Sequence, residues 1–167
     1  MHTPRRGKTE TISKLPSNLI IDLEQGAEFV ECTKLDVIDI IRKNKSNPLV
    51  VIQELGKKLD NYYNEHGKYP YDYLTVDTTS ALEEFARKYA TIMYKATPIG
   101  KSFAGTDVVS ELPSGGGYDW LRKAFDELLK PIENRCNKCF ILVSHVKNSS
   151  INKQGKDLQA KDIQLTG

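Results

Sequence analysis

A glycine–lysine–threonine sequence near the start of the chain has the residue types of a phosphate-binding loop. Gly7, Lys8 and Thr9 fit the end of the pattern GxxxxGK[ST]. In that pattern glycine lets backbone N–H groups approach phosphate oxygens, lysine places positive charge on the β- and γ-phosphates, and the hydroxyl binds Mg²⁺. The sequence therefore predicts nucleotide binding by Gly7, Lys8, Thr9 and the following Glu10, with Thr9 also a metal ligand.

The same pattern departs from its full form on the amino-terminal side. Its first glycine falls at position 2, where this chain has His2, and the strand expected before the loop is missing from the sequence. From these three residues alone, a basic, exposed terminus is the favoured interpretation. The interpretation therefore depends on the residues downstream.

Two acids follow apolar runs that are typical of buried strands. Asp77 follows the run 71–76, as the acid of a Walker B motif does, and is predicted to hold Mg²⁺. Glu24 follows the run 18–23, where a carboxylate beside a γ-phosphate can orient or deprotonate the attacking water. The alternative for both is a strand-end carboxylate in solvent.

A histidine follows a third apolar run, 140–143. His145 can donate a hydrogen bond from either ring nitrogen, so it is a candidate sensor of the γ-phosphate and is grouped with Glu24 as catalytic. The alternative is a histidine satisfied within a loop.

Helical spacing of apolar residues places helices between these strands. We expect helices over 48–63, 81–94 and 118–129, with 131–139 extending the last one, and a short strand or helical turn over 35–41. Ser80 or Thr79 is expected to cap the second helix, since Glu83 completes a capping box. Alternating strands and helices predict an α/β fold with a mostly parallel sheet, helices on both faces and ligands at the carboxyl ends of the strands.

Composition excludes several classes of protein. The 167 residues are 39% hydrophobic and 28% charged with a net charge of +2, which is typical of a globular domain and gives no sign of nucleic-acid binding by charge alone. No apolar run approaches the ~18 residues of a membrane helix, and residues 1–11 have no signal-peptide core. Cys136 and Cys139 form a CxxC without a second ligand pair, so we interpret them as thiols at the start of a buried strand.

The order of these motifs resembles a known family. GKT, LIIDLEQG, YDYLTVDT, FILVSHVK and KDLQAKDIQLTG follow one another as in the RecA-like P-loop ATPases of phage genomes, the AAA-type recombinase relatives. The resemblance spans nearly the whole chain. It implies a three-layer RecA-like core with a mostly parallel sheet, forming a single domain over 1–167 that is incomplete at both ends.

The resemblance also implies roles and partners. By position, Lys8 and Thr9 match the phosphate and Mg²⁺ residues, Asp77 the Walker B acid, Glu24 the water-activating glutamate and His145 the sensor. The implied cofactors are ATP and Mg²⁺. The implied activity is ATP-driven handling of single-stranded DNA in phage recombination or replication, by a homo-oligomer in the cytoplasm of a bacterial host.

Two segments are candidates for DNA contact. Lys147, Lys153 and Lys156, with Lys161 beyond them, lie where the RecA-like family has DNA-binding loops. Lysine contacts to phosphates give salt-dependent, sequence-independent binding. The alternative is a solvated, flexible loop. The long connection 97–117 is a second candidate, through Lys101 and a base-stacking Phe103.

Two other functions remain open from the sequence. His2 and the missing strand fit a non-catalytic RecA-fold binding or assembly module with a degenerate P-loop. A small nucleotide kinase ranks last, because such enzymes need arginine-rich lids and the arginines here do not cluster in the loops.

Overall fold

The computed structural model describes residues 7–28, 30–105, 109–113, 116–153 and 156–163. Its strands are β1 (Asn18–Asp22), β2 (Lys34–Asp36), β3 (Tyr73–Asp77), β4 (Cys139–Val143), β5 (Val146–Lys153) and β6 (Lys156–Ile163). Its α-helices are α1 (Gly7–Ser13), α2 (Val37–Asn44), α3 (Pro48–His66), α4 (Thr79–Lys95) and α5 (Gly117–Leu129). Two short 3-10 helices, η1 (Gly100–Ser102) and η2 (Val109–Glu111), interrupt the connection between α4 and α5.

Four strands form one parallel sheet in the order β2-β1-β3-β4, which confirms the predicted α/β fold. The register aligns the carboxyl ends of β1, β3 and β4, because Asp22 pairs with Asp77 and Asp77 pairs with Val143. The polar residues that follow these strands therefore leave the sheet at one common edge.

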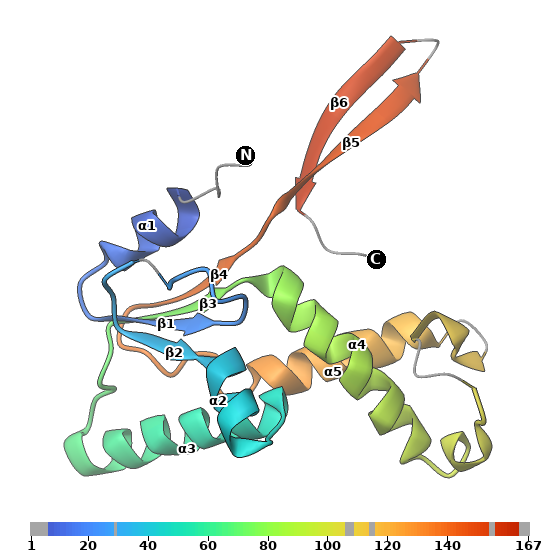
Figure 1. The fold of residues 1–167 in the computed structure, drawn as a ribbon. Helices are drawn as coiled ribbons and strands as arrows, with labels where there is room; N and C mark the ends of the chain where they lie inside the picture. Colours follow the sequence, from blue (N-terminus) through green and yellow to red (C-terminus); the bar gives the residue numbers. More distant parts are fainter. Residues whose placement is uncertain (1–6, 29, 106–108, 114–115, 154–155, 164–167) are drawn as a thin grey trace.

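Side chains of the strands alternate between two layers of helix. Leu19 and Ile21 of β1 join the larger core with α2, α3, α4 and α5, whereas Ile20 packs in a smaller cluster with Ile12 of α1 and Val143. Figure 1 shows α1 on one side of the sheet and the other four helices on the opposite side. This is the arrangement that the alternating strand and helix patterns predict.

Caps set the ends of the long helices. Asn47 accepts a hydrogen bond from the Val50 amide at the start of α3, and Gly67 ends that helix with φ of 70°. At the start of α4 the cap is Thr78, whose extended backbone lets its hydroxyl accept from the Ala81 amide. The prediction of Thr79 or Ser80 as the cap is wrong, because both residues already lie inside the helix.

The segments 35–41 and 131–139 differ from the regular elements expected there. Segment 35–41 is both strand and helix, since β2 ends at Asp36 and α2 begins at Val37, with Asp36 as its N-cap. Segment 131–139 does not extend a helix, because α5 ends at Leu129 and turns follow, including Asn134 with φ of 59°.

Strand β4 and the segment after it correct two further expectations. Strand β4 is an edge strand rather than a buried one, and 46% of its Leu142 is exposed. Strands β5 and β6 form an antiparallel ribbon where a flexible loop was the alternative, and this ribbon projects from the core in Figure 1. Within the described ranges, no helix is long and apolar enough to cross a membrane.

Candidate active site

The first helix meets the end of β4 through one lysine. Lys8 Nζ donates to the carbonyl oxygen of Ser144 at 2.9 Å and lies 2.9 Å from Nδ1 of His145. An ammonium group only donates hydrogen bonds, so Nδ1 of His145 accepts here. The lysine at the start of α1 is thus held directly over the residues that follow β4.

The same helix meets the end of β3 through a hydroxyl. Thr9 Oγ1 donates to Asp77 Oδ2 at 2.7 Å, and Asp77 is only 4% exposed. Burial raises the pKa of the Asp77 carboxyl, the Thr9 hydrogen bond lowers it, and the charges of Asp22 and Glu24 raise it further. The Thr9 hydroxyl and the Asp77 carboxylate are therefore adjacent.

Glu24 lies between the ends of β3 and β4. Its Oε1 accepts a hydrogen bond from the Thr78 hydroxyl, and its Oε2 lies 3.4 Å from Nε2 of His145. Since Nδ1 of His145 accepts from Lys8, a neutral imidazole carries its hydrogen on Nε2 and directs it toward Glu24. One chain of polar contacts therefore joins Lys8, His145, Glu24 and Thr78.

Asp22 organises the loop that carries Glu24, a role that the sequence did not reveal. Its buried carboxylate accepts from the backbone amides of Glu24, Gly26 and Ala27 at 2.9–3.1 Å. Such an arrangement fixes the loop after β1, because three backbone donors converge on one side chain. The signal for this role is the spacing D-x-E-x-G-A at the end of a strand, which resembles the local side-chain-to-backbone bonding of an Asx turn.

The other predicted nucleotide-binding residues lie at the start of α1. Gly7 begins the helix, and an added Cβ there would meet nothing within 4 Å. Glu10 is in the first turn, but its carboxylate pairs with Lys14 at 3.1 Å on the exposed side of the helix. His2 lies outside the described residues.

The donor set fits magnesium in its chemistry. Mg²⁺ prefers oxygen ligands and in P-loop sites takes one hydroxyl, one carboxylate, phosphate oxygens and water. Thr9 and Asp77 supply the two protein groups at hydrogen-bonding distance from each other. Within the described residues there is no cluster of three or more His, Cys, Asp or Glu side chains that could hold a metal ion.

Several candidates from the sequence lie elsewhere. Cys139 begins β4 and Cys136 lies in the bend before it, where burial raises the pKa of the Cys136 thiol and keeps it protonated. The ring of Phe103 packs edge-on against Tyr94 with centroids 5.6 Å apart, so it is engaged within the protein. Lys101 is exposed in η1.

The lysines proposed for DNA contact belong to the projecting ribbon. Lys147 and Lys153 are in β5, and Lys156 pairs with Lys153 across the ribbon. Because successive strand positions alternate between faces, this register puts positions 147, 153 and 156 on one face and position 161 on the other. The ribbon begins directly after His145.

A four-stranded parallel sheet between helices, with a lysine–threonine pair at the strand ends, has the fold of a P-loop NTPase core. The comparison with protein families agrees, since the family described as an AAA domain matches residues 3–166. This chain belongs to that family, which makes it a protein of the P-loop ATPase type. No curated protein matches the chain, and no solved structure does.

Proposed function

We propose that this protein binds ATP with Mg²⁺ and hydrolyses it, in the manner of the RecA-like ATPases, to act on single-stranded DNA in phage recombination or replication. The observation that carries the proposal is the convergence of α1 with the ends of β1, β3 and β4. At these strand ends Lys8, His145 and Glu24 form one chain of contacts. Thr9, next to Lys8 on α1, forms a second contact with Asp77.

Nucleotide binding is assigned to the start of α1. In this assignment Lys8 binds the β- or γ-phosphate at the helix N-terminus and gives up its contacts with Ser144 and His145 to do so. The Thr9 hydroxyl and the Asp77 carboxylate hold the magnesium ion, which neutralises charge on the phosphates when it is bound.

Hydrolysis is assigned to Glu24. Its carboxylate orients a water molecule toward the γ-phosphorus and accepts a proton as the new P–O bond forms and the bond to the β-phosphate oxygen breaks, which yields ADP and phosphate. The Thr78 hydroxyl fixes one carboxylate oxygen, and the other faces Nε2 of His145. His145 therefore touches both the phosphate-binding lysine and the proposed base.

Action on DNA is assigned to the ribbon β5–β6. Strand β5 begins at the residue after His145. If nucleotide binding moves His145, the start of β5 therefore moves with it. Three lysine positions share one face of the ribbon. Lysines that follow a strand-like track suit the phosphates of a single strand, whose binding needs no base-specific contacts.

Nucleotide titration tests the first assignment. Binding of a fluorescent ATP analogue is measured with and without Mg²⁺ for the parent, Lys8→Ala and Lys14→Ala. Loss of a charge-assisted hydrogen bond is worth about 1.5–3 kcal/mol, so Lys8→Ala is expected to bind about 10- to 100-fold more weakly. Lys14 lies just after the same helix and pairs with Glu10, so its substitution should leave the affinity unchanged.

The alternative is a non-catalytic binding or assembly module of the same fold. It predicts that phosphate release stays at the background rate while single-strand binding or self-association persists. If Lys8→Ala and the parent bind the analogue equally well, the assignment of the phosphate-binding loop is wrong.

A further inference from the structure

A groove lies between α2, α3 and α4, and none of its lining residues belongs to the candidate active site. We propose that this groove binds a short amphipathic segment of a partner protein. The apolar side chains of that segment enter the groove, and its carboxylates meet Arg42 and Lys88. The proposal goes beyond the proposed nucleotide chemistry and does not depend on it.

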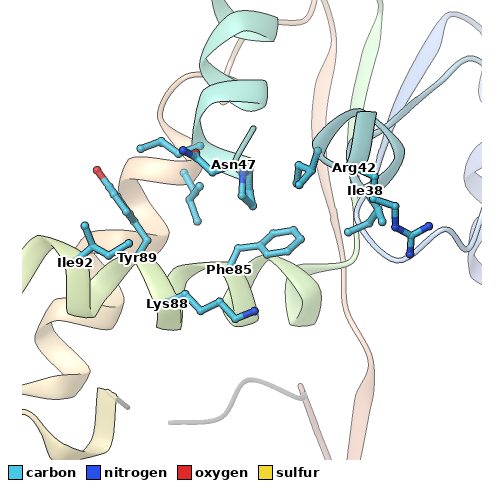
Figure 2. Close-up of a pocket in the computed structure, with 11 residues that line it drawn as sticks. Ile38, Arg42, Asn47, Phe85, Lys88, Tyr89 and Ile92 are labelled. Carbon is cyan, nitrogen blue, oxygen red and sulfur yellow. The ribbon is translucent and has the colours of Figure 1, made fainter. Parts of the chain in front are cut away.

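The groove has a volume of about 550 Å³ and walls that come from separate helices. Figure 2 shows Ile38 and Arg42 on the α2 side, Phe85, Tyr89 and Ile92 on the α4 side, and Asn47 where α3 begins. Its volume is within the range of sites that take ligands or side chains from another molecule.

The apolar residues on α4 follow one helical stripe. Phe85, Lys88, Tyr89 and Ile92 stand at positions i, i+3, i+4 and i+7, which puts them on one face of the helix. In this stripe Ile92 is 62% exposed, although a side chain of this type normally lies inside a core. An apolar stripe along an open groove is the surface that an amphipathic helix covers when it binds.

Charge at the groove indicates the chemistry of the partner. Lys43 pairs with Asp39 at 2.7 Å and Arg87 pairs with Glu83 at 2.6 Å, so the neighbouring cations are neutralised within their own helices. Arg42 and Lys88 line the groove, and in the described part of the chain neither forms an ion pair.

Among the described residues no acidic side chain lines the groove, so its charge is positive. A segment with Asp or Glu beside its apolar residues complements both cations, whereas a basic segment is repelled. Nucleic acid fits less well, because its phosphates would face apolar walls and leave them uncovered. The apolar stripe and the two cations together favour an acidic amphipathic segment.

Peptide selection on the whole chain tests the proposal with a random library as the probe. Random peptides about three helical turns long are selected on the parent and counter-selected on Ile92→Asp. The expected motif has apolar residues at i and i+3 or i+4, flanked by Asp or Glu. A labelled copy of the enriched peptide is then titrated by fluorescence anisotropy, together with a copy whose acids are replaced by lysine.

Matched variants locate the binding surface. Ile92→Asp is expected to weaken the acidic peptide about tenfold or more, because it removes an apolar contact and adds a repelling charge. Lys88→Glu and Arg42→Glu should also weaken it. Two control variants lie outside the groove. Ile99→Asp changes an isoleucine that is 80% exposed, and Lys58→Glu reverses an exposed charge on α3. Both variants should bind the acidic peptide as tightly as the parent does.

Several results would overturn the proposal. They are a selection that enriches nothing, a motif that is basic or lacks acids, and binding that Ile92→Asp does not change. Sedimentation of the parent, Ile92→Asp and Ile99→Asp tests whether the groove binds a second copy of this chain instead. If the parent self-associates and only Ile92→Asp, not Ile99→Asp, dissociates it, the groove is a contact between copies of this chain and the proposal of a separate partner is wrong.

Discussion

The hydroxyl of Thr9 donates a hydrogen bond to Asp77 across 2.7 Å, which joins the first helix to the end of β3. Asp77 is almost fully buried and has two further acids, Asp22 and Glu24, in its electrostatic environment. Burial alone raises the pKa of this carboxyl, and the neighbouring acids add to the effect. The protein thus keeps an acid at a position that disfavours its charge, as expected where a cation binds.

Replacement of Asp77 by asparagine should stabilise the protein at neutral pH in the absence of Mg²⁺. Between the ordinary carboxyl pKa of 3.8 and the raised pKa of Asp77, the folded protein holds more protons than the unfolded chain. The free energy of unfolding therefore falls as pH rises through this window and stays lowered above it. Urea unfolding across a pH series should give Asp77→Asn a larger free energy of unfolding than the parent at pH 7. The difference should shrink as the pH falls toward 4.

Asp72 provides a control of opposite sign. A hydrogen bond from Lys138 holds the pKa of its carboxyl below 3.8, so its charge contributes stability that is lost as pH falls through the lowered pKa. Asp72→Asn should then unfold more easily than the parent at pH 7, and the two should converge in acid. An Asp77→Asn protein that is less stable than the parent at pH 7 would contradict the account of burial.

Glu24→Gln should slow turnover and spare nucleotide binding. Glutamine keeps an oxygen that can accept from the Thr78 hydroxyl, but it cannot take a proton from water. General base catalysis contributes about 10²- to 10⁴-fold, so phosphate release should fall by that factor. The affinity for the ATP analogue should match the parent. An equal loss of binding and turnover would assign Glu24 to the nucleotide rather than to the water.

Replacement by valine should affect stability differently at two adjacent threonines at the start of α4. Thr78 caps the helix and donates to Glu24, so Thr78→Val should lower the free energy of unfolding by about 0.5–2 kcal/mol. The buried hydroxyl of Thr79 has no hydrogen-bond partner among the described residues. Thr79→Val should therefore leave stability unchanged or raise it, since a buried unsatisfied hydroxyl carries a desolvation cost.

Chemical denaturation separates these outcomes, and Thr78→Ser serves as the conservative control. Serine retains the hydroxyl for both contacts, so Thr78→Ser should keep the stability that Thr78→Val loses. If Thr79→Val destabilises the protein as much as Thr78→Val, the hydroxyl of Thr79 has a partner that this structure does not show.

These threonines also show where sequence reasoning stopped. Short apolar runs, the helical segments between them and the polar residues at the ends of the runs were sufficient to predict the parallel sheet and the residues at its edge. The hydroxyls 78, 79 and 80 are chemically alike in sequence, and only the extended backbone of Thr78 makes it the cap. Likewise Asp22 and Glu24 are acids two positions apart, and only folding turns one toward backbone amides and the other toward His145.

The groove was beyond sequence reasoning for another reason. Phe85, Tyr89 and Ile92 have the spacing of any helix face that packs in a core, so the sequence does not distinguish a groove from a buried face. Tertiary packing decides the outcome, because α2 and α3 leave this part of α4 uncovered. Patterns along one helix do not report how far the neighbouring helices extend.

The ribbon offers the sharpest test of the proposed DNA function. Removal of Lys147, Lys153 and Lys156 by alanine substitution should weaken binding to single-stranded DNA of any sequence. Each lost phosphate contact makes the negative slope of log K against log salt shallower by about 0.7. The slope of the triple variant should therefore be shallower than that of the parent by about 2. Fluorescence anisotropy at several salt concentrations measures the slope.

Lys161 is the matched control, because the register of β5 and β6 puts it on the opposite face of the ribbon. If the three-lysine face tracks the DNA backbone, Lys161→Ala should leave both the affinity and the salt slope close to those of the parent. Equal losses from all four lysines would indicate general charge attraction without a defined track. An unchanged slope in the triple variant would remove the ribbon from the DNA site while leaving the assignments of Lys8 and Glu24 untouched.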